Sequence, residues 1–197
     1  MSLLFESIKI IDGVIQNLDY HQRRVDRSLL QVSESSKPWI LKDIIVPSQS
    51  MQGINKCRFT YNCQYSEYVI EPYHPRIIER LHMVEANSLD YSLKWKDRSQ
   101  IENLIKNVNE HEEVVIVKNG LVTDASYANL AFFDSKHWYT PHTPLLPGTK
   151  RQKLIDDKLL LPAVITPDDM PRYYKVSLIN AMLELGEVEI AIENVYR

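Results

Sequence analysis

The sequence has few of the features that mark secreted, membrane or nucleic-acid-binding proteins. Its 197 residues include only two cysteines, Cys57 and Cys63, which have no partners at metal-ligand spacing, so we expect free thiols. No apolar run approaches the roughly 20 residues that span a bilayer, and residues 1–13 lack the basic region of a signal peptide. The net charge of −3 offers no basic surface to nucleic acid or to an anionic membrane. We therefore expect a cytoplasmic protein with no nucleic-acid or membrane partner.

Short motifs that identify an active site on their own are also missing. The chain has no Walker A sequence and no GxGxxG, HExxH, GxSxG or CxxC. The six histidines are scattered without ligand spacing, so we expect structural or surface roles for them and no metal site. The hydrophobic share of 44% and the charged share of 25% are ordinary for a globular protein. At this level the sequence predicts an α+β enzyme or a binding protein.

Hydrophobic periodicity predicts mainly β-structure in the first half of the chain, with one long helix. The expected strands are rich in β-branched and aromatic residues and lie at 5–11, 14–18, 57–61, 65–71 and 77–85. Asp12-Gly13 is a hairpin turn signal, and Asp19 is predicted to cap a helix that ends near Val32. A polar, irregular stretch at 87–95 is interpreted as a linker between two domains.

The second half is also rich in strands, which are expected at 114–117, 121–123, 130–133, 138–139, 176–179 and 188–190. Asn119-Gly120 is the strongest hairpin signal in the chain. Asp97 or Ser99 is predicted to cap one helix, and Thr149 is predicted to cap a second that ends near Leu160. Because strands and helices do not alternate regularly, the pattern favours an α+β fold over a doubly wound sheet.

Three segments in a fixed order are more informative than any single motif. The first is Leu93-Lys94-Trp95-Lys96-Asp97-Arg98, which precedes an amphipathic helix. The second is a hairpin strand and polar turn at 120–130, and the third is a proline-rich loop at 140–151 that opens a helix. With FESIKIIDG, LDYHQRRV and SLINAM elsewhere in the chain, this series resembles the class IV family of pyridoxal 5′-phosphate (PLP) enzymes. That family includes branched-chain and D-amino-acid aminotransferases and aminodeoxychorismate lyase.

The resemblance implies a two-domain fold-type IV architecture of the α+β class, similar to D-amino-acid aminotransferase. A small α+β domain is expected at residues 1–88 and a larger, β-rich, PLP-binding domain at 89–197. Relative to the family pattern the sequence begins near the FETIRV strand, so we expect an N-terminally short member. Because family members place the active site near a two-fold interface, we also expect a homodimer.

The resemblance assigns three residues to the reactive parts of the cofactor. Lys94 matches the lysine that binds PLP covalently, Asp124 matches the acidic residue at the pyridine nitrogen, and Arg24 matches the arginine that holds the phosphate. A reactive lysine needs a lowered pKa, which desolvation and a neighbouring cation such as Lys96 or Arg98 would favour. A carboxylate keeps the ring nitrogen protonated, so that the ring withdraws electrons. Most of the family has glutamate where this chain has Asp124.

The resemblance also assigns four residues to supporting roles in cofactor binding. Gly148 and Thr149 match the helix start whose backbone N–H groups receive the phosphate. Asn180 falls where the family has a second phosphate contact, and the alternative is that it caps a turn. Asn129 matches an asparagine near the cofactor strand, and the alternative is that it braces the hairpin.

The activity that the resemblance favours is that of a 4-amino-4-deoxychorismate lyase, which forms 4-aminobenzoate and pyruvate in folate biosynthesis. The chain shows no evident motif for binding an α-carboxylate, which suits a lyase better than a transaminase. One alternative is a class IV aminotransferase that acts on branched-chain or D-amino acids. Another is a non-catalytic member that binds PLP or another ligand. In each enzyme reading the partner is a small, amino-acid-like substrate.

Overall fold

The computed structural model describes residues 2–33 and 38–197, which form two compact units. The small unit comprises residues 1–75 together with 93–97, and the large unit comprises 76–92 together with 98–197. This division differs from the boundary predicted between residues 88 and 89. Two pairings account for the difference. Strand β5 (Arg80–Glu85) pairs with a strand of the large unit, and Trp95 forms a β-bridge with Leu4 in the small unit.

The small unit contains an antiparallel sheet of four strands in the order β2-β1-β3-β4. The strands are β1 (Leu4–Ile11), β2 (Val14–Ile15), β3 (Ile54–Tyr61) and β4 (Ser66–Pro72). Strands β1 and β3 pair along their full lengths, which fixes the register of the sheet. The hairpin predicted from 57–61 and 65–71 is confirmed. The return strand predicted at 14–18 is only two residues long, because a helix begins at Leu18.

Two helices complete the small unit, α1 (Leu18–Val32) and α2 (Leu41–Ile44). The N-cap of α1 is Asn17, so the prediction of Asp19 was wrong. Asn17 has a left-handed backbone with a φ of 52°, which asparagine adopts more readily than most residues. Asp19 lies in the first turn instead, where its negative charge complements the helix dipole.

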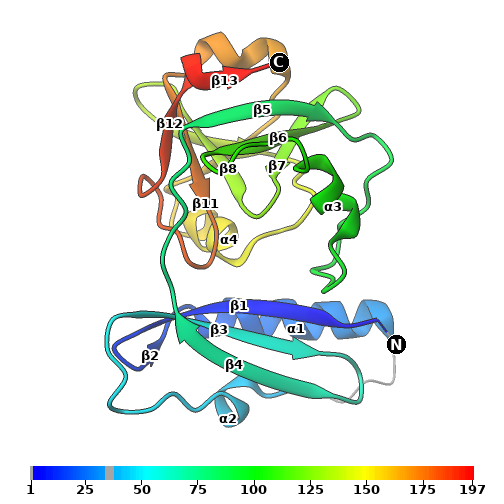
Figure 1. The fold of residues 1–197 in the computed structure, drawn as a ribbon, viewed down its shortest axis with the longest axis vertical. Coiled ribbons are helices and arrows are strands. Elements are labelled where there is room, and N and C mark those ends of the chain that lie inside the picture. The colour runs from blue at the N-terminus through cyan, green and yellow to red at the C-terminus, as the bar shows by residue number, and fades with distance from the viewer. Residues whose placement is uncertain (1, 34–37) are drawn as a thin grey trace. The chain divides into compact units, whose positions relative to one another are not determined.

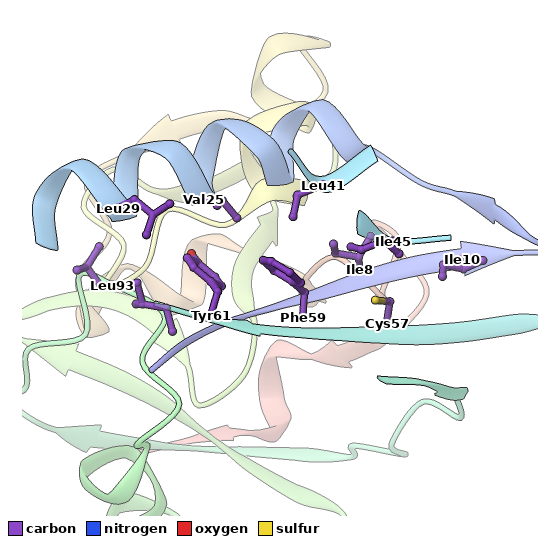
Figure 2. Close-up of a cluster of buried hydrophobic side chains, with 11 residues drawn as sticks. Ile8, Ile10, Val25, Leu29, Leu41, Ile45, Cys57, Phe59, Tyr61 and Leu93 are labelled. Carbon is purple, nitrogen blue, oxygen red and sulfur yellow. The ribbon is translucent and has the colours of Figure 1, made fainter. Parts of the chain in front are cut away.

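The apolar core of the small unit lies between the sheet and α1, which runs along one face of the sheet (Figure 1). Valine and leucine side chains on one face of α1 contact alternate residues of β1 and β3, because strand side chains point to opposite faces in turn. The buried members, ten of them labelled in Figure 2, are Leu4, Ile8, Ile10, Val25, Leu29, Leu41, Ile45, Cys57, Phe59, Tyr61 and Leu93. Cys57 and Cys63 are free thiols, as predicted.

The large unit is built on nine strands in the order β10-β9-β8-β7-β6-β5-β13, with β11 pairing to β8 and β12 pairing to β11. Besides β5, the strands are β6 (Glu112–Lys118), β7 (Leu121–Ala125), β8 (Asn129–Phe133), β9 (Trp138–Pro141), β10 (Leu161–Ala163), β11 (Lys175–Ile179), β12 (Glu189–Ala191) and β13 (Val195–Tyr196). Most pairs are antiparallel, but β5 pairs in parallel with β6 and β13, and β9 with β10. The turn at Asn119-Gly120 has φ values of 52° and 77°, which suit the predicted tight hairpin.

The helices of the large unit are short and peripheral to its strands: α3 (Ser99–Leu104), α4 (Thr149–Asp156), and the 3-10 helices η1 (Pro167–Arg172) and η2 (Ile192–Asn194). Helix α4 has Gly148 as its N-cap, not Thr149, and it ends four residues before the predicted Leu160. It ends early because Lys158 has a left-handed backbone with a φ of 61°. The predicted α+β class is confirmed. Among the described residues, no helix is long and apolar enough to span a membrane.

Candidate active site

Lys94 lies in a turn that is bound to the first residues of strand β1 in the small unit. The N–H of Phe5 donates a hydrogen bond to the Lys94 carbonyl at 3.0 Å, and the N–H of Trp95 donates to the Leu93 carbonyl at 2.9 Å. The second bond closes a three-residue γ-turn with Lys94 at its centre. Leu93 belongs to the buried core of the small unit (Figure 2), and Trp95 is partly buried against that core. The predicted cofactor lysine is therefore held by its two neighbours, and its Nζ lies 4.6 Å from the centroid of the Phe5 ring.

A buried polar network joins strand β1 to helix α1. Arg24 donates to the Glu6 carboxylate from Nε at 2.8 Å and from Nη2 at 2.5 Å, and His21 Nδ1 lies 2.6 Å from Oε2 of the same group. Glu6 is fully buried, and the other two side chains are nearly so. His21 and Arg24 are three residues apart on α1, so both face the strand. The network places a charged pair inside an otherwise apolar interface between helix and sheet.

Electrostatics fixes the protonation of this network. Burial opposes ionisation of Glu6, but the charge of Arg24 and the hydrogen bonds from His21 and Arg24 outweigh it and lower the Glu6 pKa to about 2. Burial is also the main reason why the pKa of His21 is lowered, and the charges of Arg24 and Lys94 act in the same direction. His21 is therefore neutral near pH 7, and its Nδ1–H donates to the Glu6 carboxylate.

A second buried acid, Asp124, organises the candidate site of the large unit. Asp124 at the end of β7 lies directly opposite Asn129 at the start of β8. The Asn129 Nδ2 donates to Asp124 Oδ1 at 2.7 Å and to the Leu146 carbonyl at 2.9 Å. The Leu146 N–H donates to Asp124 Oδ2 at 2.9 Å. The bond to Asp124 joins the two strands of the β7–β8 hairpin, which agrees with the hairpin-bracing alternative, and the bond to Leu146 also holds the loop before α4. The role of Asn129 beside the cofactor stays a prediction.

The environment of Asp124 disfavours a negative charge. Burial raises the pKa of Asp124 to about 6, although the hydrogen bonds from Leu146 and Asn129 and the charge of Arg151 all act to lower it. Arg151 does not bind the carboxylate itself: its Nη2 donates to the Pro141 carbonyl at 2.8 Å. A partner that brings a positive charge or a strong donor to this carboxylate would restore its ionised form.

Asn129 occupies the space that a side chain at position 148 would need, which favours glycine at this position. A Cβ built on Gly148 would lie 1.9 Å from the Asn129 Oδ1. The next residue, Thr149, begins α4, so the hydrogen bonds of Asn129 and the absence of a side chain at Gly148 together set the position of the helix start. The first N–H groups of a helix have no partner within the helix, which makes this end suited to an anion.

Asn180 is placed by its own turn after β11. Its Oδ1 accepts hydrogen bonds from the N–H groups of Met182 at 2.8 Å and Leu183 at 3.0 Å, and its Nδ2 donates to the Tyr127 carbonyl at 3.2 Å. These contacts agree with the turn-capping alternative. The phosphate roles predicted for Asn180, Arg24, Gly148 and Thr149 stay predictions, as does the covalent role of Lys94.

Sequence reasoning missed two buried side chains that act on predicted site residues, Glu6 on Arg24 and Arg151 on Asp124. Glu6 was not assigned a role, although a glutamate between apolar residues of a strand indicates a buried acid that needs a cation. Arg151 lies at the end of the segment 140–151, for which no charged role was predicted, and its charge acts on Asp124. The signal for Glu6 was available in the sequence, whereas the influence of Arg151 depends on how the loop folds.

Comparison with known proteins identifies the family. The model of the class IV aminotransferases matches residues 77–190, more than half of the chain. An uncharacterized protein from Haemophilus influenzae is 37% identical over 182 residues, which cover 91% of this chain and 97% of that protein. The chain therefore belongs to the class IV aminotransferase family, as the sequence motifs predicted, and it is an enzyme of the lyase or aminotransferase type.

Two solved structures extend this result. A protein from Haemophilus somnus, provisionally named a 4-amino-4-deoxychorismate lyase, is 35% identical with a TM-score of 0.88, and the match covers 94% of this chain and 98% of that one. A hypothetical aminotransferase from Mycobacterium tuberculosis in a PLP-bound form is 14% identical with a TM-score of 0.76, covering 98% of this chain and 81% of that one. The second likeness concerns the fold alone. The fold-type IV architecture predicted from the sequence is confirmed.

The class IV family depends on PLP, and residues of each unit fit parts of that cofactor. In the large unit, a protonated pyridine nitrogen would supply the opposite charge that the buried Asp124 carboxylate lacks. The start of α4 suits a phosphate group. In the small unit, Lys94 supplies an amine on a braced segment.

The first prediction concerns the buried ion pair. Glu6→Gln keeps the shape of the side chain but leaves the charge of Arg24 buried without a carboxylate, so we expect the free energy of unfolding at pH 7 to fall by about 3 kcal/mol. Because the Glu6 pKa is lowered from 4.5 to about 2, its stabilising effect is complete above pH 4.5 and is lost as the pH falls toward 2. Urea denaturation followed by circular dichroism measures both effects. The control is Glu71→Gln, which breaks an exposed pair with Lys56 and should cost far less than Glu6→Gln. Similar losses in the two variants would contradict the prediction.

The second prediction tests the contact between Gly148 and Asn129. Gly148 has a φ of −71° and a ψ of 146°, which alanine adopts without strain, so a loss in Gly148→Ala reports on the steric contact. We expect a destabilisation of about 1 to 3 kcal/mol, the usual cost of overpacking. Asn129→Ala removes the opposing oxygen, and in that background the same substitution should cost much less. A cost that is equal in both backgrounds would show that the contact is not the cause.

The third prediction concerns the titration of Asp124 in the cofactor-free protein. Its pKa is raised from 3.8 to about 6, so its favourable contribution is complete below pH 3.8 and is lost as the pH rises through 6. Asp124→Asn does not titrate, so its stability relative to the wild type should rise by about 2 kcal/mol between pH 4 and pH 7. The altered hydrogen bonds of Asp124→Asn change the free energy of unfolding by the same amount at every pH. Only the part of the difference that varies with pH therefore reports on the titration of Asp124. A flat difference would show that the carboxylate is ionised in the folded protein.

Proposed function

We propose that the protein is a PLP-dependent 4-amino-4-deoxychorismate lyase that forms 4-aminobenzoate and pyruvate. The observation that carries the proposal is the 35% identity with the Haemophilus somnus protein, which extends over nearly the full length of both chains. Its provisional name is that of this lyase. The family match and the fit of Asp124, the α4 start and Lys94 to a PLP cofactor support the dependence on PLP.

Each candidate residue would have a distinct task in holding the cofactor. Lys94 would bind it covalently through Nζ, Asp124 would bind the ring nitrogen, and the backbone at Gly148 and Thr149 would receive the phosphate, with Arg24 as a further phosphate contact. The cofactor supplies an electron sink, which lowers the energy needed to remove a proton from the carbon that bears the substrate amine. Asp124 would maintain that sink by keeping a proton on the ring nitrogen.

Lys94 would also move the proton in the reaction. The Lys94 amine would accept a proton from the carbon that bears the substrate amine. The γ-turn and the packing of Leu93 and Trp95 limit the positions from which Nζ can act. Loss of that proton and of the pyruvate group makes the substrate ring aromatic, which drives the lyase reaction forward.

The second candidate function is that of an aminotransferase, and the description of the matching family favours it. An aminotransferase would use the same lysine and the same acid, so the residues described above do not separate the two reactions. The two reactions differ in whether they need a second substrate. A transaminase requires a 2-oxo acid as acceptor, whereas the lyase releases 4-aminobenzoate without one.

The fourth prediction tests the cofactor and then the reaction. Protein incubated with PLP is reduced with borohydride and mapped by peptide mass spectrometry, and we expect the label on Lys94. The loaded enzyme is then given 4-amino-4-deoxychorismate without a 2-oxo acid, and we expect 4-aminobenzoate and pyruvate in equal amounts. Lys94→Ala is the control for both steps. A label on another lysine would refute the role of Lys94, and product formation only with a 2-oxo acid would favour the aminotransferase.

A further inference from the structure

The first turn of helix α4 contains a lysine whose position is unfavourable for the helix itself. Lys150 is the second residue of α4, and no acidic residue lies in that turn. A cation near the start of a helix opposes the helix dipole. The Lys150 side chain is also only 5% exposed, and a buried ammonium group is costly unless a partner compensates for it. The stability of α4 therefore does not explain why a lysine lies here.

The partner of Lys150 comes from a distant part of the large unit. Lys150 Nζ donates a hydrogen bond to Oε2 of Glu184 at 2.6 Å. Glu184 lies in the turn that follows β11, 34 residues further along the chain. Its side chain is half-exposed, so the carboxylate keeps part of its hydration while it compensates for the buried cation. The ion pair therefore binds the start of α4 to this turn.

The turn at residues 180–187 has hydrogen bonds of its own that hold its shape. The N–H of Glu184 donates to Oε2 of Glu187 at 2.8 Å. The N–H of Gly186 donates to Oγ of Ser177 at 3.0 Å, and Ser177 is a buried residue of β11. These bonds join the turn to the strand before it. The main chain of Glu184 therefore has a defined position in the large unit.

The same turn also contacts the hairpin that carries the acid of the candidate site. Asn180 Nδ2 donates to the carbonyl of Tyr127, which lies between β7 and β8, and Asp124 belongs to β7. Two routes therefore connect Asp124 with the start of α4. One runs through the loop that Asn129 holds, and the other runs through the turn at 180–187 and its ion pair. The aromatic ring of PLP keeps its nitrogen and its phosphate at a nearly fixed separation, so the two ends of a PLP site need a matching separation.

We propose that Lys150 and Glu184 form a positioning pair for the phosphate of PLP. This inference rests on the proposed function, from which it takes the cofactor and the phosphate role of the α4 start. The pair binds that helix start to the turn that contains Asn180, so that the two segments with predicted phosphate contacts keep one spacing. Because the pair has no net charge, it acts through position and not through attraction of the phosphate.

The fifth prediction compares PLP with pyridoxal, which has the same ring and aldehyde but no phosphate. Dissociation constants for both are measured from the absorbance change when each is added to cofactor-free protein, a readout that requires no turnover. We expect Lys150→Met to reduce the preference for PLP over pyridoxal by about 10-fold, the lower end of the effect of losing a residue that orients a metal ligand. Methionine is flexible and suits a buried site, so the fold should persist.

Glu184→Gln decides whether the pair acts through position or Lys150 acts through its charge. If position matters, Glu184→Gln reduces the preference as Lys150→Met does, and the double variant loses no more than either single variant. If the charge of Lys150 attracts the phosphate directly, removal of the competing carboxylate raises the preference instead. Because Glu184 is half-exposed, Glu184→Gln also provides the test if Lys150→Met does not fold.

Lys153→Met is the matched control, because it removes another lysine of the same helix from an ion pair. Lys153 pairs with Asp157 near the end of α4, away from its first turn. Its loss should leave the preference for PLP unchanged. An equal reduction in Lys153→Met would show that the preference reports on the stability of α4 alone, and it would overturn the inference.

The results separate this inference from the proposed function. The inference is overturned if the single variants weaken both ligands equally, if Glu184→Gln keeps or raises the preference, or if the two single effects add in the double variant. Failure of the lyase assay with a pair-dependent preference for PLP would refute the lyase and leave the positioning pair supported. An active lyase with no such dependence would do the reverse.

Discussion

The arrangement of the small unit depends on the position of strand β1, because the two faces of this strand and its main chain each make different contacts. One face contributes Leu4, Ile8 and Ile10 to the core, and Glu6 lies among them facing helix α1. The opposite face carries Phe5, whose ring is contacted by two cations. The main chain at its beginning binds the segment that holds Lys94. A shift of β1 by one residue would exchange its two faces, so its pairing with β3 along its full length also fixes the candidate site.

Each unit contains a buried carboxylate, and the pKa values of these two groups are shifted in opposite directions. Glu6 has Arg24 as a direct partner and is ionised at any physiological pH. Asp124 has four hydrogen bonds or charges that favour its ionised form but no cation bound to it, and burial prevails. The first arrangement is complete and stabilises the fold. The second is incomplete, which is the condition expected of a group that awaits a ligand of opposite charge. The aspartate is also one methylene shorter than the glutamate of most family members, and the braced loop at Leu146 approaches it closely.

The sequence predicted the family, the α+β class and most strands, because these follow from hydrophobic alternation and from motifs such as Asn119-Gly120 that act locally. It did not predict that residues 93–97 return to β1, since that pairing joins segments far apart in the chain. The caps of α1 and α4 were misplaced by one or two residues for a different reason. Several residues near each start can act as a cap, and the choice depends on tertiary contacts such as that of Asn129 with Gly148. The partners of Arg24 and Asp124 likewise depend on packing that the sequence does not display.

The pairing of Arg24 with Glu6 changes how its predicted phosphate role would operate. The carboxylate accepts hydrogen bonds from Nε and Nη2, so the pair has no net charge. A phosphate that reached Arg24 would therefore meet a neutral ion pair and would gain a directed hydrogen bond more than a Coulomb attraction. His21 adds no charge, because its lowered pKa keeps it neutral. Attraction of the dianion would then depend mainly on the start of α4, where backbone N–H groups and the helix dipole act without a neutralising acid in the first turn.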